Sequence, residues 1–244
     1  MAKINYNVKM TESPLEIKQM ELGPMENYIY LVTNKFTKDC VVIDPAWDVD
    51  AIKDEVSANG LNLKAALITH GHPDHTNGIE ELLKHYDIPI MVSESEAEFY
   101  KPIGENIIDV KASHKLELGD AENRIDIDFV HTPGHTPGSQ CFYIKTAKRS
   151  YSAANDVHFE SENILVSGDT LFLDGCGRCD MPGGDAEVMY DTISNILMKM
   201  PDDTVIFPGH NYHHYCCDSL ENQKKTNPYM QFDNLKSFIG KRLG

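Results

Sequence analysis

The sequence Thr69-His-Gly-His-Pro-Asp-His75 places three imidazoles and one carboxylate within the six positions from His70 to His75. Histidine is the commonest metal ligand near neutral pH, and aspartate supplies the anionic oxygen that hard or borderline cations prefer. The alternative explanation is a chance cluster of solvated histidines. Because chance does not usually gather this many possible ligands in one short run, the sequence predicts a metal site.

This histidine run joins an expected strand to an expected helix. Residues 62–68 form an apolar run of strand length, and residues 78–84 have apolar side chains at helical spacing. Loops at the ends of strands commonly present functional side chains on a rigid scaffold. The position of the run and its composition therefore both indicate a functional loop.

The bulk properties indicate a globular protein and exclude some partners. The chain has 244 residues, of which 41% are hydrophobic and 25% charged, which suits one large domain or one domain with a small extension. The formal net charge of −16 disfavours nucleic acid and anionic membranes as partners. No apolar stretch is long enough for a transmembrane helix or a signal peptide, so we expect a cytoplasmic location.

The six cysteines are expected to be reduced in such a protein. Cys176 and Cys179 form a C-x-x-C pair that could be redox-active or bind metal. A single pair cannot build a four-cysteine zinc site, so a loop feature is the simpler interpretation. A non-catalytic metal or redox module at Cys176/Cys179 stays as a third hypothesis for the function.

Strand and helix patterns alternate along the chain. In the first part, strands are expected at 28–32, 40–43, 65–69 and 88–92, with helices at 48–60, from the histidine run to about 86, and through 99–100. In the second part, strands are expected at 124–130, 140–144, 163–167 and 204–208, and a helix at 185–200. Residues 145–162 are expected to be a hairpin excursion or surface loop, and the tail to form short helices. The pattern predicts an α/β fold, a four-layer αβ/βα sandwich of two mixed sheets with outer helices.

Three further sites repeat one layout, in which a short apolar strand is followed by a glycine-flanked His or Asp. They lie at 129–138, 164–170 and 205–211. Glycine lets the backbone turn sharply and approach a bound ion. The candidate ligands number seven, which suits two adjacent cations with one bridging carboxylate: His70, His72, Asp74, His75, His135, Asp169 and His210.

The ordered set of these sites resembles the metallo-β-lactamase fold superfamily over roughly residues 20–229. The resemblance implies one domain over 1–244 with a short helical C-terminal tail from about 218. It also implies two ligand groups: His70, His72 and His135 for one metal, and Asp74, His75 and His210 for the other, with Asp169 bridging. The absence of cysteine from the ligand positions is similar to the glyoxalase II-like branch.

Two further segments narrow the resemblance. Gly168–Phe172 followed by Gly175–Asp180 resembles the G-D-T-L-F…G-C-G-[KR] segment of glyoxalase II-like hydrolases. Residues 23–32 and 43–48 resemble small bacterial hydrolases of that branch, including zinc-dependent hydrolases of polyketide biosynthesis. Two departures concern glutathione recognition: Cys179–Pro182 replaces an aromatic-rich segment, and only 34 residues (244 − 210) follow His210.

The implied function is metal-dependent hydrolysis of a small-molecule or carrier-bound thioester by a metal-bound hydroxide. Two divalent ions are expected, zinc first, with iron or manganese possible. The resemblance gives catalytic roles to Asp74, His75 and Asp169. Arg178 could hold an anionic part of the substrate or form a surface salt bridge, and Tyr212 could contact the substrate.

The alternative is a glutathione persulfide dioxygenase of the same fold. Such enzymes share the G-C-G-R-x-D pattern at 175–180, a short tail and a Glu…Asn-Pro stretch like residues 221–228. They use a single iron held by two histidines and one aspartate. The corresponding residues are His70, His135 and Asp169.

Overall fold

The first of two facing sheets has seven strands in sequential order. The computed structural model describes residues 3–8, 14–97, 103–153 and 157–243. The pairs from β1 to β4 are antiparallel and the pairs from β4 to β7 are parallel, so the sheet is mixed. Its strands are β1 (Lys3–Val8), β2 (Leu15–Leu22), β3 (Asn27–Asn34), β4 (Asp39–Ile43), β5 (Asn62–Leu67), β6 (Ile90–Ser93) and β7 (Ile107–Val110).

The second sheet has the order β15-β14-β11-β10-β9-β8 and is also mixed, because β11 and β14 run parallel. A separate small hairpin, β12 (Leu171–Phe172) with β13 (Gly175–Cys176), follows β11. The strands of the second sheet are β8 (Lys115–Leu118), β9 (Ile125–His131), β10 (Gln140–Ala153), β11 (Val157–Gly168), β14 (Val205–Pro208) and β15 (Asp218–Ser219).

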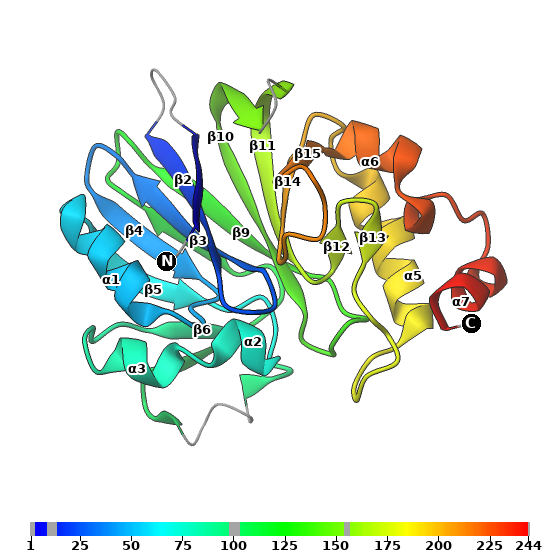
Figure 1. Cartoon of the computed structure of the whole chain (residues 1–244), viewed down its shortest axis with the longest axis horizontal. Coiled ribbons are helices and arrows are strands. Elements are labelled where there is room, and N and C mark those ends of the chain that lie inside the picture. Colours follow the sequence, from blue (N-terminus) through cyan, green and yellow to red (C-terminus); the bar gives the residue numbers. More distant parts are fainter. Residues whose placement is uncertain (1–2, 9–13, 98–102, 154–156, 244) are drawn as a thin grey trace.

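Helices cover the outer face of each sheet, as Figure 1 shows. Beside the first sheet lie α1 (Val49–Ala58), α2 (Pro73–Thr76) and α3 (Ile79–Leu83). Beside the second lie α5 (Ala186–Asn195), η2 (Leu197–Lys199), α6 (Leu220–Thr226), η3 (Pro228–Met230) and α7 (Leu235–Leu243). The predicted four-layer αβ/βα sandwich is therefore confirmed. No described helix is long and apolar enough to cross a membrane.

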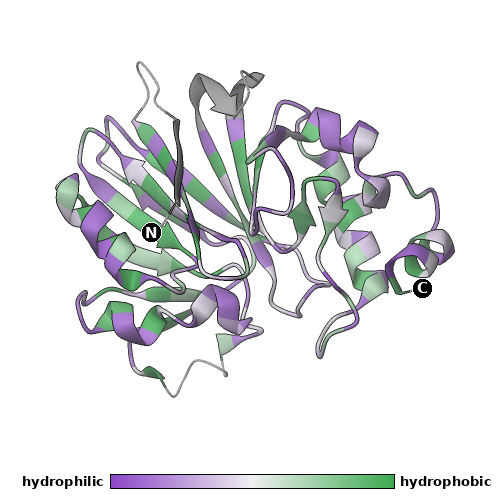
Figure 2. Ribbon diagram, viewed as in Figure 1, coloured by the Kyte–Doolittle hydropathy of each residue, from purple (hydrophilic) through white to green (hydrophobic). Residues whose placement is uncertain are grey.

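Both faces of the central strands are buried, which explains why they are apolar without alternation (Figure 2). In β4, Val41 and Ile43 face the core between the sheets, whereas Cys40 and Val42 face α1 and α3. A third apolar cluster joins the second sheet to α5, α6 and α7. The strands that sequence patterns missed include the short edge strands β7 and β8, in each of which only one residue is fully buried.

Several element boundaries differ from the sequence-based expectations. The single helix expected after the histidine run is two short helices, α2 ending at Thr76 and α3 starting at Ile79. Gly78 between them packs against Pro45, whose carbonyl oxygen would lie 2.7 Å from a Cβ at this position. Residues 145–162 belong largely to the long β10–β11 hairpin. Residues 218–219 pair with β14, so the helical tail begins at Leu220. The helix expected through 99–100 lies outside the described residues.

Candidate metal centre

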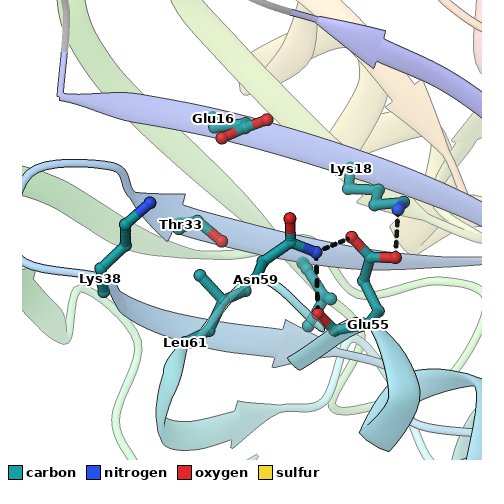
Figure 3. A pocket seen from close by; sticks show the side chains of 8 residues that line it. Glu16, Lys18, Thr33, Lys38, Glu55, Asn59 and Leu61 are labelled. Carbon is teal, nitrogen blue, oxygen red and sulfur yellow. Dashed lines mark hydrogen bonds and ion pairs between the residues drawn. The ribbon is translucent and has the colours of Figure 1, made fainter. Parts of the chain in front are cut away.

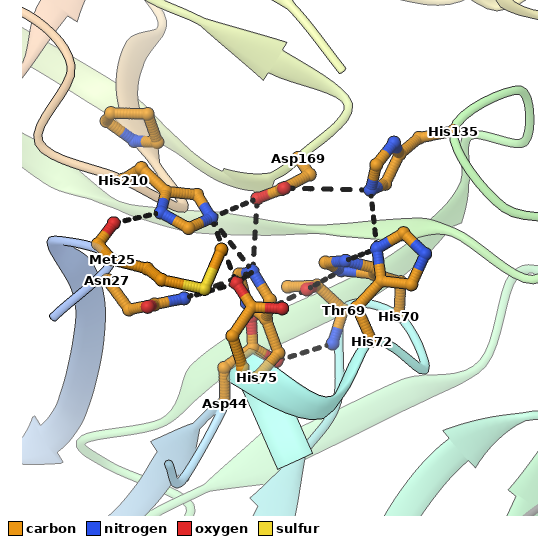
Figure 4. Close-up of polar contacts among 12 residues, drawn as sticks. Met25, Asn27, Asp44, Thr69, His70, His72, His75, His135, Asp169 and His210 are labelled. Atoms are coloured by element: carbon orange, nitrogen blue, oxygen red, sulfur yellow. Dashed lines mark hydrogen bonds and ion pairs between the residues drawn. The ribbon is translucent and has the colours of Figure 1, made fainter. Parts of the chain in front are cut away.

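The candidate ligands gather where strands of both sheets end (Figure 4). The histidine run follows β5 of the first sheet, while His135, Asp169 and His210 follow β9, β11 and β14 of the second. Within each sheet, parallel neighbours direct their carboxyl ends to one edge: β4 and β5 in the first sheet, and β11 and β14 in the second. Contacts of Asp169 with His75 and of His210 with Asp74 join the loops at these two edges. All seven residues named from the sequence are thereby assembled in one place.

The first ligand group consists of His70, His72 and His135. Nε2 of His70 lies 3.1 Å from Nδ1 of His72, and Nε2 of His135 lies 2.9 Å from the same atom. His70 and His135 are almost completely buried. Three ring nitrogens thus converge on one point from two different loops.

The second ligand group consists of Asp74, His75 and His210. The Nε2 atoms of His75 and His210 are 3.2 Å apart, and Oδ2 of Asp74 lies 3.4 Å from each of them. These two imidazoles are as deeply buried as those of His70 and His135, whereas His72 is only partly buried. The geometry of the two groups is therefore comparable.

Asp169 lies between the groups. Its Oδ1 is 3.3 Å from Nε2 of His75 and 3.4 Å from Nε2 of His210, and its Oδ2 is 3.6 Å from Nε2 of His135. Oδ1 is buried and accepts no hydrogen bond from any described residue. A buried carboxylate oxygen without a donor is costly, so the site suits a cation at this atom.

Hydrogen bonds on the far side of the rings fix which nitrogen of each imidazole is free. Nδ1 of His135 donates to the Arg178 carbonyl at 2.7 Å, and Nδ1 of His210 donates to the Met25 carbonyl at 2.9 Å. Carbonyl oxygens can only accept, so the proton of each ring stands on Nδ1. The Nε2 lone pairs are left facing the centre, which is the form that binds metal.

Asp44 has the same effect on His70 and His75. Its Oδ2 accepts from Nδ1 of His75 at 2.9 Å and from the Thr69 hydroxyl at 2.6 Å. Since that hydroxyl has given its proton to Asp44, the 3.0 Å contact with His70 must be donated by Nδ1 of His70. In the sequence, Asp44 was noted only within the resemblance of residues 43–48, and no role at the ligands was given to it. The available sign was its position directly after β4, the parallel neighbour of β5.

Asn27 and Trp47 form a second support that sequence reasoning missed. Nδ2 of Asn27 donates to Oδ2 of Asp74 at 3.0 Å, and Nε1 of Trp47 donates to Oδ1 of Asn27 at 2.8 Å. Asn27 is buried at the start of β3 and forms an isolated bridge with His210. Trp47 thus orients Asn27, and Asn27 holds the carboxylate of Asp74 in position, although neither residue is a candidate ligand.

The charge states suit cation binding. Burial lowers the pKa of His70 and of His135, which keeps these rings neutral. Burial also disfavours protonation of His75, but Asp169 and Asp44 outweigh it and raise the pKa, so without a metal this ring favours a proton on the nitrogen that faces the centre. A bound cation would take the place of that proton and supply the same positive charge beside Asp169. Burial opposes ionisation of Asp169, yet the surrounding imidazoles hold its pKa well below the usual value. Converging lone pairs beside an ionised carboxylate are a donor set for divalent cations.

The two residues expected to contact substrate lie beside this centre. The guanidinium of Arg178 makes a bidentate pair with the exposed Asp180, at 2.9 and 2.8 Å, so its carbonyl rather than its side chain reaches the ligands. The ring of Tyr212 stacks on His210 at 4.6 Å between centroids and is 55% exposed. Partial burial and the nearby Asp169 raise the pKa of Tyr212 to about 12, so its phenol is neutral.

The C-x-x-C pair is separate from the metal centre. Cys176 and Cys179 are buried free thiols, and burial raises the pKa of both. Neither belongs to a candidate ligand cluster within the described part of the chain. These findings support the interpretation of the pair as a feature of the loop.

A second pocket, away from the metal centre, is a less convincing candidate for a functional site (Figure 3). It lies on the outer face of the first sheet, with Lys38 at the opposite end of β4 from Asp44. Lys18 and Glu55 neutralise each other in an ion pair, and Asn59 donates to Glu55 at 2.6 Å. The pocket gathers no group comparable with the buried ligands.

Comparisons with known proteins agree with this geometry. The family described as "Metallo-beta-lactamase superfamily" matches residues 22–210. The probable polyketide biosynthesis zinc-dependent hydrolase BaeB of Bacillus velezensis is 30% identical over 216 residues, covering 88% of this chain and 87% of that protein. The hydroxyacylglutathione hydrolase of Pectobacterium carotovorum is 33% identical over 190 residues, covering 77% of this chain and 62% of that protein.

A solved structure supports the same assignment. The crystal structure of ETHE1 from Myxococcus xanthus superimposes with a TM-score of 0.76 at 25% identity, covering 93% of this chain and 91% of that one. The fold of this superfamily binds divalent metals, in keeping with the cluster of His and Asp. On the family match, the sequence relatives and the shared fold, the chain belongs to the metallo-β-lactamase superfamily.

Proposed function

We propose that this protein is a metal-dependent hydrolase of thioesters with two divalent cations, zinc in the first place. The observation that carries the proposal is the position of Asp169, whose Oδ1 faces His75 and His210 and whose Oδ2 faces His135. One carboxylate that reaches two buried ligand groups is the arrangement expected for a pair of adjacent ions. Iron or manganese would suit the same His and Asp donors.

When bound, the two cations supply an activated water and positive charge for a developing oxyanion. The chain contributes the geometry that this chemistry needs. Asp169 keeps the two groups adjacent, and Asp74 and His75 complete the second group. The acceptors behind the rings, Asp44 among them, keep each Nε2 directed inward without rearrangement during turnover.

The acidity of the leaving group supports a thioester, rather than an amide, as the substrate. A thiol has a reference pKa of about 8.5, so it departs as a thiolate without a strong general acid. Tyr212 stacks on His210, which supports the proposal that its neutral phenol contacts the substrate. The names of the relatives, a polyketide biosynthesis hydrolase and a hydroxyacylglutathione hydrolase, also support this class.

We further propose a cytoplasmic protein that folds as one domain over 1–244 and takes a small-molecule or carrier-bound substrate. The net charge of −16 supports the exclusion of nucleic acid and anionic membranes from its partners.

A persulfide dioxygenase is the second candidate. The observation that favours it is the similarity in fold to ETHE1, a persulfide dioxygenase, with a TM-score of 0.76. In that case a single iron would be held by His70, His135 and Asp169. The second ligand group would then have no metal.

Metal content and oxygen dependence separate the two candidates. We expect two zinc ions per chain and release of thiol from an acyl thioester at equal rates in air and under nitrogen. Asp169→Asn should abolish the reaction, while Asp54→Asn on the exposed face of α1 should leave it unchanged. One iron per chain and turnover of a glutathione persulfide only with O₂ would reject the hydrolase.

A further inference from the structure

The last helix of the chain reaches the loop that carries the C-x-x-C pair. Phe238 of α7 is completely buried, and its ring lies 5.5 Å from Tyr190 of α5 and 6.0 Å from Tyr229. These contacts hold α7 against the outer helices of the second sheet. The last turn of α7 thereby comes to lie beside residues 175–180.

Arg242 makes the contact between that turn and the loop. Its Nε donates to the carbonyl oxygen of Gly177 at 2.8 Å, and its guanidinium lies 5.7 Å from the ring centre of Tyr229. A charged donor on a carbonyl forms a stronger hydrogen bond than a neutral one. Arg242, on the outer side of the loop, therefore holds the Gly177 carbonyl in position.

The same peptide unit touches the metal centre on its inner side. A Cβ at Gly177 would lie 2.0 Å from the carbonyl oxygen of Asp169 and 2.9 Å from Cγ of His135, so the backbone packs directly on both ligands. The next carbonyl, that of Arg178, accepts the Nδ1 proton of His135 at 2.7 Å. One short segment thus links Arg242 to His135.

We propose that Arg242 is a positioning residue for the first ligand group. Its hydrogen bond to Gly177 fixes the following peptide, so that the Arg178 carbonyl keeps the proton of His135 on Nδ1 and directs Nε2 toward His72. The second group does not depend on this contact, because the Met25 carbonyl holds His210 and Asp44 holds His75. Gly177 also touches the backbone of Asp169, but it accepts nothing from the rings of the second group. Loss of Arg242 should therefore weaken the binding of the first cation more than that of the second. The inference concerns metal binding alone and does not depend on the substrate.

The test is a competition titration of the full-length protein with zinc and a chromophoric chelator, which resolves two binding steps. Loss of a residue that hydrogen-bonds to a metal ligand changes metal affinity by roughly 10–100-fold. Arg242 acts on His135 through the backbone of Gly177 and Arg178, so Arg242→Met should weaken one of the two zinc-binding steps by about tenfold, the low end of that range. Arg242→Lys should recover part of the loss, because an ammonium can donate to the same carbonyl. The control is Lys241→Met at the exposed preceding position, which should bind zinc normally.

A double-mutant cycle distinguishes positioning from simple anchoring of α7. If Arg242 acts through His135, Arg242→Met should cause no further loss of affinity in a His135→Ala background. Equal weakening of both steps, unchanged affinity with a lowered melting temperature, or an undiminished effect without His135 would each overturn the proposal. Should Arg242→Met not fold, Arg242→Lys is judged by the same outcomes.

The result stays informative if the hydrolase proposal fails. A protein that binds one iron would still use His135, so its single binding step should weaken by the same factor. An unchanged single step would overturn the role of Arg242 without bearing on the reaction.

Discussion

Oδ2 of Asp44 lies 2.9 Å from Nδ1 of His75, and this contact joins the end of β4 to the loop after β5. The same carboxylate accepts from the backbone N–H of Thr69 at 2.7 Å and from its hydroxyl at 2.6 Å. Asp44 is 3% exposed, so water cannot replace these bonds when the carboxylate is removed. One residue therefore supports both the fold of the histidine loop and the orientation of a candidate ligand.

We predict that Asp44→Ala lowers both stability and metal affinity. The buried N–H of Thr69 would lose its acceptor, at a cost of about 1–3 kcal/mol in the free energy of unfolding, and zinc affinity should fall by roughly 10–100-fold. Urea denaturation and zinc titration measure the two effects. Asp39→Ala, at the other end of β4, removes a partly exposed ion pair with Lys64 at 3.2 Å and should cost less than about 1 kcal/mol. Equal losses in the two variants would contradict the role given to Asp44.

Gly209→Ala should disturb the bridging position of Asp169. A Cβ at residue 209 would lie 2.4 Å from Oδ1 of Asp169 and 2.9 Å from the backbone of Gly168, so the carboxylate must move. We expect a loss of about 1–3 kcal/mol in stability and reduced metal stoichiometry. Gly240→Ala in α7 meets no atom within 4 Å and should be neutral or stabilising, by up to about 1 kcal/mol. Normal metal content in Gly209→Ala would show that Asp169 is not constrained as described.

Removal of metal should lower the melting temperature of the protein. The two ligand groups converge only in the folded state, so a bound cation stabilises that state and not the unfolded chain. A ligand at 100 times its dissociation constant stabilises the native state by about 2.7 kcal/mol. Chelator-treated protein should recover its melting temperature progressively as zinc is added. Calcium, which prefers oxygen ligands, should not restore it. A melting temperature that does not change with zinc would argue against a resident metal.

The cysteines should be unreactive in the folded protein. Burial raises the pKa of Cys40 to about 12 and that of Cys141 to about 11, and it also raises the pKa of Cys176 and Cys179. Because the thiolate is the nucleophile, iodoacetamide at pH 8 should label none of the thiols before unfolding and all six in guanidinium. Rapid labelling of Cys176 or Cys179 in the native protein would revive the hypothesis of a redox pair.

Much of the fold could be predicted because its signals are local. Residues 40–43 and 164–166 are apolar on both faces, as strands between two layers must be. Asp48 caps α1 by accepting from the Ala51 N–H. The edge strand β8 and the short hairpin of β12 and β13 were missed, although their partners lie close in the sequence. Strands this short carry too few residues to show a periodic pattern, and β8 is mostly exposed.

The sequence by itself determined the chemistry of the ligands: imidazole and carboxylate side chains stand beside glycines at strand ends, and this can be recognised from neighbouring residues alone. The resemblance to a known family added how those ligands group. Only the tertiary structure decided what holds them. Asp44 acts on His75 across 31 positions, and Asn27 acts on Asp74 across 47. Contacts of this kind follow from strand order and sheet packing, so no local pattern of residues encodes them.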